Sequence, residues 1–465
     1  MPTRYQTGVV TGAVLPTLLR RRSTDEYHPP PLTPPEHRSR ARAGAALASR
    51  AEQARRHPLV FAATRTATAV ALRAIDAEAG EGFFAVPVDA ERSAAVADDT
   101  FDDLDGPGVV DVQTHLVNPS RFHGPSAEAL SWYLSMADSE RWSAGVDANL
   151  LAPAVWADTV FGRSETALAL ITAPPGADDT RVIDNDEIGL CRTIVDQHAG
   201  PGRVLTHAIV HPNEAGDLAA MAEWTIDCRP SGWKVYPLHG PRPDAVDPAH
   251  TGWFLDDETG TAFLERVRHL GPRRVAVHKG ISGAIHDASP AGASPRDVGP
   301  AAAAFGDIDF LVYHSGYEPN RPETAYRPDG LGVDELITSC ARHDIGTDAN
   351  VYAELGSTWH LVVRKPEQAA HVVGKLLAHF GADRILWGTD SVWYGSPQPL
   401  IDAFRAFTIP ERMQERFGYP PLTTETKRKI LSTNAQQVYD AAVPDRSDDW
   451  VRAVSERLAA AFPPV

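Results

Sequence analysis

Short apolar runs alternate with alanine-rich, amphipathic stretches along the chain from Gly108 to about residue 440. Runs of Val, Ile and Leu without polar alternation are typical of parallel strands buried on both faces, and the stretches between them read as helices. The runs are GVVDV from Gly108, TALALIT from Thr166, RVLTHAIV from Arg203, GWKVY from Gly232, RRVAVH from Arg273, DIDFLVYH from Asp307, NVYAEL from Asn350 and DRILWGTD from Asp383. Eight strands alternating with helices predict a (β/α)8 barrel of the TIM type. A doubly wound sheet is the alternative, but no glycine-rich turn follows the first run.

The chain ends differ from this pattern. We expect a proline-rich and helical N-terminal extension over residues 1–105, a barrel over 106–442 and a C-terminal helix over 443–465. Within the extension, Tyr27–Arg38 is rich in proline and is predicted to be extended, and Ser39–Arg56 is predicted to be helical. The paired arginines before the next apolar stretch resemble a twin-arginine export signal. Arg65 interrupts that stretch, however, which favours a second amphipathic helix.

Composition narrows the class of protein. A hydrophobic content of 43% and a charged content of 23% over 465 residues are typical of a folded enzyme. The formal net charge of −17 argues against a nucleic-acid surface, which needs clustered cations. Three separated cysteines give neither a disulfide framework nor a thiolate metal site, and no apolar run approaches a membrane span. We therefore expect a cytoplasmic protein without nucleic-acid or membrane partners.

Polar side chains stand where several of the predicted strands end. The active site of a barrel lies at the carboxyl ends of its strands, so these side chains should meet at one mouth. Imidazole and carboxylate groups that converge are ligands suited to zinc or a neighbouring divalent ion. The residues are Gln113 and His115 in the first strand, Lys234 in the fourth, and His278, His314, Glu354 and Asp390 at the ends of the fifth to eighth.

The ordered motifs resemble the amidohydrolase superfamily. They are DVQTH in strand one, VAVHKG in strand five, FLVYHSG in strand six, LWGTDS in strand eight and the closing KILSTNAQQVY. The nearest branch is the amidohydrolase-related group that includes aminocarboxymuconate semialdehyde decarboxylase and the resorcylate decarboxylases. The resemblance covers about Gly108 to Tyr439 and not the N-terminal extension.

The resemblance implies roles for individual residues. It makes His115, His278 and Asp390 metal ligands and gives His314 the task of polarising or deprotonating bound water or substrate. Gln113 departs from the family, since most members have the first His of an HxH pair there and some decarboxylases have Glu. The Gln113 carbonyl oxygen could still be a ligand, although a weaker one than imidazole. Dinuclear members use a carboxylated lysine of strand four as a bridge, and Lys234 stands in that strand.

These residues together predict a metal-dependent hydrolase. Metal-activated water would cleave a C–N or ester bond in a small molecule, with Asp390 and His314 as the catalytic residues. Glu354 is expected to approach the site or to pair with Lys234. Zinc is the first expectation for the cofactor, with Mn2+ or Fe2+ as alternatives, and we expect a homo-oligomer. Two other functions stay open: non-oxidative decarboxylation of a small unsaturated or aromatic acid, and a metal-free barrel that acts as a binding protein.

Overall fold

The coordinates are a computed structural model of the chain. The structure describes residues 15–21, 24, 27, 31–48, 64–80, 82–86, 108–135, 146–176, 181–214, 216–238, 252–282, 291–444 and 449–465. The expected boundary between the extension and the barrel at residue 105 lies outside these residues, as does the paired-arginine stretch before residue 64.

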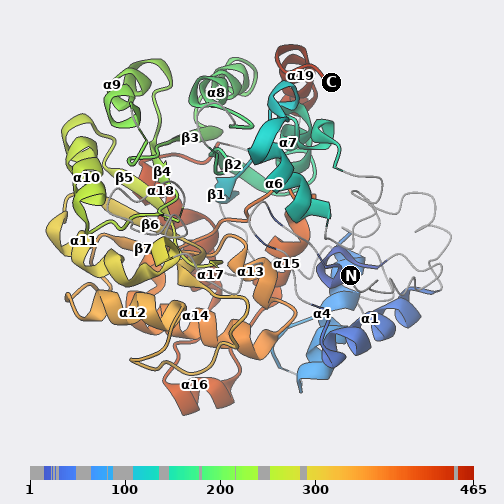
Figure 1. The fold of residues 1–465 in the computed structure, drawn as a ribbon. Helices are drawn as coiled ribbons and strands as arrows, with labels where there is room; N and C mark the ends of the chain where they lie inside the picture. The colour runs from blue at the N-terminus through green and yellow to red at the C-terminus, as the bar shows by residue number, and fades with distance from the viewer. Residues whose placement is uncertain are drawn as a thin grey trace, which may run out of the picture.

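Eight parallel strands form a barrel in the order of the chain (Figure 1). The strands are β1 Val109–Thr114, β2 Thr166–Ile171, β3 Val204–Ile209, β4 Gly232–Val235, β5 Arg274–His278, β6 Asp309–Tyr313, β7 Val351–Glu354 and β8 Ile385–Leu386. The barrel closes between its first and last strands, because Thr114 pairs with Ser391 and the Asp390 amide donates to the Gln113 carbonyl at 2.9 Å. The (β/α)8 prediction is therefore confirmed, with each strand in its predicted run.

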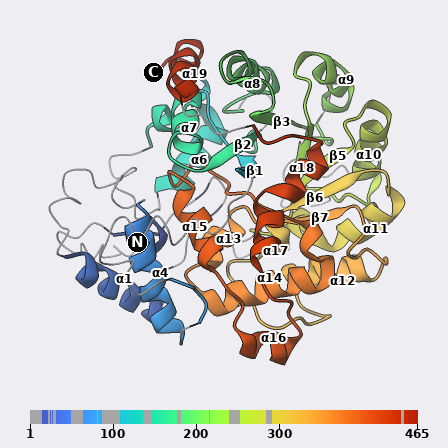
Figure 2. The same cartoon turned by 180° about the vertical axis from the view of Figure 1, so that it is seen from behind.

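Helices surround the strands, as the views from front and back show (Figures 1 and 2). They begin at polar caps such as Asp184, whose side chain forms a capping box with Glu187. The helices after β1 are α6 Gly124–Ser135, α7 Pro153–Val160, α8 Asn185–Ala199, α9 Asp217–Asp227, α10 Glu258–Leu270, α11 Val298–Ala304, α12 Val333–Ala341, α13 Thr358–Val362, α14 Pro366–Phe380, α15 Gln398–Ala406, α16 Glu411–Phe417, α17 Thr424–Arg428, α18 Asn434–Tyr439 and α19 Asp449–Ala461. None of the described helices is long and apolar enough to cross a membrane.

The barrel interior is filled by side chains and closed at its amino-terminal end by α18. Val110, Leu168 and Leu311 belong to one buried cluster that also contains Tyr439 of α18. The Tyr439 hydroxyl lies 2.9 Å from Nε2 of His207, a fully buried histidine of β3. Substrate access is therefore confined to the other end of the barrel, where the polar strand ends lie.

The N-terminal extension is helical, and one prediction for it is wrong. It contains a short 3-10 helix at Thr17–Leu19, α1 at Pro34–Leu47 and α4 at Arg65–Ala79. The stretch Tyr27–Arg38 is not extended throughout, because α1 begins inside it at Pro34. Proline is tolerated in the first turn of a helix, where its missing N–H has no intrahelical partner. The Thr33 side chain and Glu36 complete a capping box at this start.

The extension packs against its own barrel. Helix α4 contacts α14 and α15, and Leu72 is fully buried in the cluster that also contains the outer barrel residues. The Glu36 carboxylate of α1 lies 3.1 Å from the Arg364 guanidinium, and both side chains are almost completely buried. At the other end of the chain, α19 packs against α7 and α8 (Figure 2). Helices α4 and α19 therefore both pack against the outer helices of the barrel.

The buried Glu36–Arg364 pair predicts an acid-sensitive contact. Burial opposes the ionised Glu36 carboxylate, but the Arg364 charge and the Thr33 hydrogen bonds lower its pKa below the ordinary value. A lowered pKa contributes stability above the ordinary Glu pKa of ~4.3, and this contribution is lost as the pH falls. We expect Glu36→Gln to lower the free energy of unfolding by about 3 kcal/mol at pH 7, and the difference from wild type to shrink towards pH 3. Denaturant unfolding at both pH values measures this.

The exposed pair of Glu425 with Arg428 is a matched control. Glu425→Gln should change stability by less than about 0.5 kcal/mol, because exposed ion pairs contribute little. Equal losses in the two variants would contradict the account of the buried pair.

Candidate active site

The residues predicted from the strand ends converge at the carboxyl end of the barrel. A register shift in β1 positions the first two, because Asp111 and Thr114 pair with Ala169 and Ile171 and so place three residue steps of β1 against two of β2. Thr114 points outward and accepts a hydrogen bond from Trp156 of α7 at 3.0 Å. Its neighbours therefore point inward: the Gln113 amide lies 3.1 Å and His115 Nε2 lies 3.0 Å from the same Asp390 oxygen.

Each of the three histidines is held by a backbone carbonyl. The His115 Nδ1 lies 2.8 Å from the Thr172 oxygen, the His314 Nδ1 lies 2.7 Å from the Gly356 oxygen, and the His278 Nε2 lies 2.9 Å from the Gly280 oxygen. A carbonyl can only accept, so that ring nitrogen carries the proton. In the neutral ring the second nitrogen is then a lone-pair donor. Metal-ligating histidines are held in this way.

The second ring nitrogens of two of these histidines lie among the other predicted ligands. His115 Nε2 is 3.0 Å from Asp390 Oδ1, and His314 Nε2 is 3.5 Å from the Gln113 amide nitrogen. The His278 ring packs edge-on against His314, with 4.6 Å between ring centroids. All five side chains are at most 1% exposed. Nitrogen and oxygen atoms about 3 Å apart match the spacing of neighbouring ligands at metal bonds of ~2.1 Å.

Asp390 is ionised although it is buried. Burial alone would raise its pKa, but the hydrogen bond and charge of His115, the charge of His314 and the Ser357 hydroxyl together lower it below the ordinary value. The Ser357 hydroxyl donates to Oδ2, so that Oδ1 stays turned towards His115 and Gln113. Asp390 therefore presents a negative charge to the converging histidines.

The Gln113 amide has one buried atom without a hydrogen-bond partner among the described residues, its oxygen Oε1. The amide nitrogen faces Asp390 and His314 instead. A Cβ on Gly356 would stand 2.0 Å from Gln113 Oε1 and 2.6 Å from Glu354 Oε1, so both oxygens border the same glycine. Turning the amide over would direct its oxygen to the histidines and its N–H groups to the Glu354 carboxyl. That orientation satisfies both ends of the amide when a cation is present.

Glu354 supports the site through the backbone. Its carboxyl accepts hydrogen bonds from the amides of His314 at 3.1 Å and Gly356 at 2.6 Å. Burial raises the pKa of Glu354 to about 8 despite these bonds, and the nearby charges of Asp390 and Asp111 add to the rise. The carboxyl is thus protonated at neutral pH, which suits a group that positions His314 rather than one that binds a cation.

Lys234 lies deeper in the barrel than the histidines. Its ammonium group stands 4.3 Å from the ring centre of Tyr236 and 4.1 Å from that of Tyr313. The Tyr236 ring is in turn 5.6 Å from the His278 ring. Lys234 therefore reaches the candidate ligands through an aromatic layer, and its bridging role stays a prediction.

The backbone at this mouth is strained. His314, Ser315, Ser357 and Asp390 all have positive φ, between 51° and 68°. Side chains in the left-handed region cost about 1–2 kcal/mol each, and such residues cluster at functional sites. This backbone conformation turns the side chains of His314, Ser357 and Asp390, which follow β6, β7 and β8, towards one another.

Two residues of this site were not predicted. Ser357 follows β7 and fixes Asp390, and Asp111 accepts hydrogen bonds from the amide and the hydroxyl of Thr389. Burial raises the pKa of Asp111 to about 7. Asp111 begins the DVQTH motif, so its polar character inside an apolar run was the available signal.

Within the described part of the chain, no three His, Cys, Asp or Glu side chains already surround a common point that could hold a metal ion. The candidate ligands are hydrogen-bonded to one another instead. Their chemistry nevertheless fits a divalent ion, which would replace the proton on a second ring nitrogen beside an ionised carboxylate and an unsatisfied amide oxygen.

Comparison with known proteins assigns the family. A family model described as Amidohydrolase matches residues 110–441. The chain belongs to the amidohydrolase family. The match contains the candidate ligands and ends directly after α18. The amidohydrolase assignment made from the motifs, and with it the expectation of an enzyme, is confirmed.

Solved structures similar to this amidohydrolase have low sequence identity. A 5-carboxyvanillate decarboxylase from Novosphingobium aromaticivorans complexed with manganese has 12% identity and a TM-score of 0.45 over 73% of this chain and 97% of its own. A 2,6-dihydroxybenzoate decarboxylase from Rhizobium has 14% identity and a TM-score of 0.40, covering 72% and 99%. A probable 2-pyrone-4,6-dicarboxylic acid hydrolase from Acinetobacter baumannii has 11% and 0.42, covering 72% and 99%. No curated protein sequence matches the chain.

The Ser357 hydroxyl predicts a measurable contribution. Ser357→Ala leaves a residue with a Cβ at the same positive φ but removes the hydroxyl that donates to the buried Asp390 carboxylate. We therefore expect a loss of about 1–3 kcal/mol in the free energy of unfolding. Ser455→Ala is the control, because the Ser455 hydroxyl donates to the neutral carbonyl of Ala154. Its effect should stay within about 0.5 kcal/mol. Denaturant titration of both variants decides, and a Ser357 variant as stable as the control would contradict the assignment.

Proposed function

We propose that this amidohydrolase is a metal-dependent hydrolase that cleaves a C–N or ester bond in a small molecule. The observation that carries the proposal is the tautomer of the three histidines: backbone carbonyls hold the proton on one nitrogen of each ring. The second nitrogen of each ring is then the atom that a cation would take, beside an ionised Asp390. His379 has the same kind of contact, with the Ile345 carbonyl, so what distinguishes these three rings is that they stand at the carboxyl ends of β1, β5 and β6 close to Asp390.

The ion would be held by His115, His278 and Asp390, with the Gln113 oxygen as an added weak ligand. A divalent ion supplies Lewis acidity, which makes water acidic enough to react at a pH of ~7. Zinc is the first candidate, and Mn2+ or Fe2+ would use the same donors.

The proton transfers belong to Asp390 and His314. Asp390 is ionised, so its carboxylate can accept a proton from the attacking water and pass it to the leaving nitrogen or oxygen. His314 carries its own proton on Nδ1, bonded to Gly356, so its Nε2 can only accept. This geometry favours deprotonation by His314 over polarisation of the substrate. The Glu354 carboxyl accepts the backbone N–H of His314 and so keeps His314 in position.

Decarboxylation of a small unsaturated or aromatic acid is the second candidate. It is favoured by Gln113, because the family resemblance places the departure from HxH where some decarboxylases also differ. Asp390 would then deliver a proton to carbon instead of to a leaving group. A pH-stat assay on small esters, lactones and amides detects hydrolysis, and CO2 release from hydroxybenzoic acids detects the alternative. Asp390→Asn should lower the observed rate at least ~100-fold in either case.

The ligand set predicts a metal content. We expect close to one divalent ion per chain in the purified protein, measured by elemental analysis, and loss of activity on treatment with a chelator. A protein without metal whose activity survives the chelator would contradict the proposal and favour a metal-free binding barrel. Two ions per chain would instead assign Lys234 as a bridging ligand.

Gln113 predicts a gain of affinity. Gln113→His should restore the HxH pair, because the register shift already turns this position towards Asp390. We expect zinc affinity to rise about tenfold or more, measured by competition against a chelator of known strength. Gln113→Leu removes the amide without adding a ligand and is the control. Equal affinity in the parent and the His variant would show that residue 113 does not reach the metal.

A further inference from the structure

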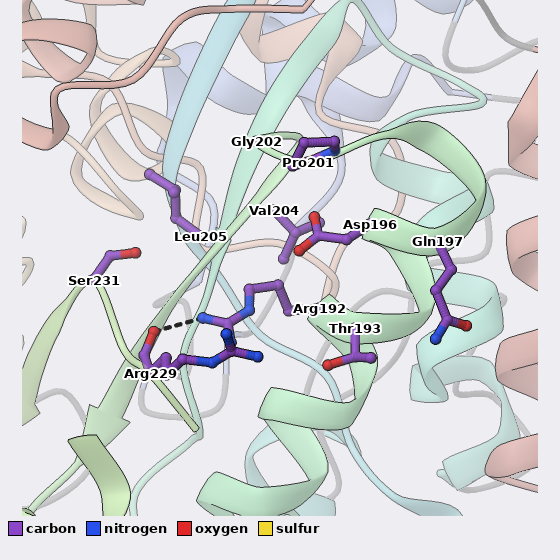
Figure 3. A pocket seen from close by; sticks show the side chains of 10 residues that line it. All are labelled: Arg192, Thr193, Asp196, Gln197, Pro201, Gly202, Val204, Leu205, Arg229 and Ser231. Carbon is purple, nitrogen blue, oxygen red and sulfur yellow. Dashed lines mark hydrogen bonds between the residues drawn. The ribbon is translucent and has the colours of Figure 1, made fainter. Parts of the chain in front are cut away.

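A second pocket lies at the amino-terminal end of the barrel, remote from the candidate active site. It has a volume of about 540 Å³ and borders the starts of β3 and β4 (Figure 3). The pocket is formed by α8, by the turn from α8 to β3 and by the connection from α9 to β4. The length of β3 separates it from the mouth of the barrel, a distance of about 16 Å at ~3.3 Å per residue.

Two arginines give this pocket a positive charge. Arg192 of α8 donates through Nη1 to the carbonyl oxygen of Arg229 at 2.5 Å, so the two residues meet in the pocket wall. Burial lowers the pKa of Arg192, and the charge of Arg229 lowers it further. Neither guanidinium group forms an ion pair with a carboxylate among the described residues. The Asp196 charge opposes this lowering, so two cations and one carboxylate leave the pocket with one positive charge in a protein whose net charge is −17.

Asp196 lines the same pocket, and one of its two carboxylate oxygens has no hydrogen-bond donor among the described residues. Its carboxylate accepts the backbone N–H of Gly202, and the buried oxygen Oδ1 has no hydrogen-bond partner among the described residues. Burial raises the pKa of Asp196, while the charges of Arg192 and Arg229 oppose the rise. A buried acceptor normally has a partner, so a hydrogen-bond donor is missing from this position.

We propose that the pocket binds a small acidic amino acid or a molecule of the same charge pattern. Its carboxylate groups would be bound by Arg192 and Arg229, and its ammonium group would donate to Asp196. The three side chains sum to one positive charge, which a ligand with two carboxylates and one ammonium group neutralises. Val204 and Leu205 offer an apolar wall for its methylene groups, and the volume suits a small molecule.

The bound ligand would tie α8 to the connection before β4. Arg192 and Asp196 belong to α8, whereas Arg229 lies shortly before the start of β4 at Gly232. Arg229 also has a strained backbone, with φ of 44°. Binding should therefore stabilise the folded chain without any contribution from the metal ligands.

L-Glutamate and glutarate form a matched pair of probes, because they differ in the ammonium group. Isothermal titration of the purified protein should show L-glutamate binding more tightly than glutarate, by about tenfold. Arg192→Gln and Arg229→Gln should each weaken L-glutamate binding about tenfold or more. Asp196→Asn should remove the preference for L-glutamate over glutarate. Arg457→Gln, on the exposed face of α19, is the control and should bind as wild type does.

Two results would overturn the proposal: no L-glutamate binding at millimolar concentration, or unchanged affinity in both arginine variants. Arg192→Gln also removes a hydrogen bond to the Arg229 carbonyl, so circular dichroism must confirm its fold. Among the described residues, the Arg229 side chain makes no hydrogen bond to a backbone carbonyl. Arg229→Gln therefore keeps the test valid if the first variant unfolds. Because no metal or turnover is measured, failure here is independent of the proposed hydrolase activity.

Discussion

The hydrogen bond from a histidine ring to a backbone carbonyl is the constraint on which the candidate active site depends. Three strand ends use it, at Thr172, Gly280 and Gly356, and each bond decides which ring nitrogen keeps its proton. Thr172 and Gly356 belong to loops that leave the neighbouring strands β2 and β7, and Gly280 belongs to the loop that follows β5 itself, so the barrel backbone positions all three rings. A side-chain partner could rotate away, whereas a carbonyl in the barrel wall cannot. The site is therefore organised before any ligand arrives.

Burial acts in opposite ways on carboxyl groups a few ångströms apart. Glu354 and Asp111 receive hydrogen bonds mainly from the backbone and from a threonine, and burial raises their pKa values to about 8 and about 7. Asp390 receives a serine hydroxyl and two histidines, which lower its pKa instead. Neighbouring acids thus divide into one charged group that faces the histidines and two groups with raised pKa values that hold the backbone.

The barrel and most of its polar strand ends could be predicted because both depend on local patterns. A parallel strand buried on both faces reads as an apolar run, and its carboxyl end is where His278 and His314 stand. Ser357 and Asp111 were missed because their importance arises from contacts with strands distant in sequence. The start of α1 at Pro34 was missed because proline was weighed as a helix breaker and not as a first-turn residue.

The packing of the extension has a consequence for how the chain folds during synthesis. Helices α1 and α4 are made before the barrel, yet α14 and α15, which α4 contacts, are made in the last quarter of the barrel. Glu36 meets Arg364 across 328 residues of intervening chain. The apolar face of α4 therefore stays exposed until almost the whole barrel has been synthesised. Contacts between residues so distant in sequence also form slowly. The extension is thus made before the barrel but reaches its folded position only after most of the barrel is complete.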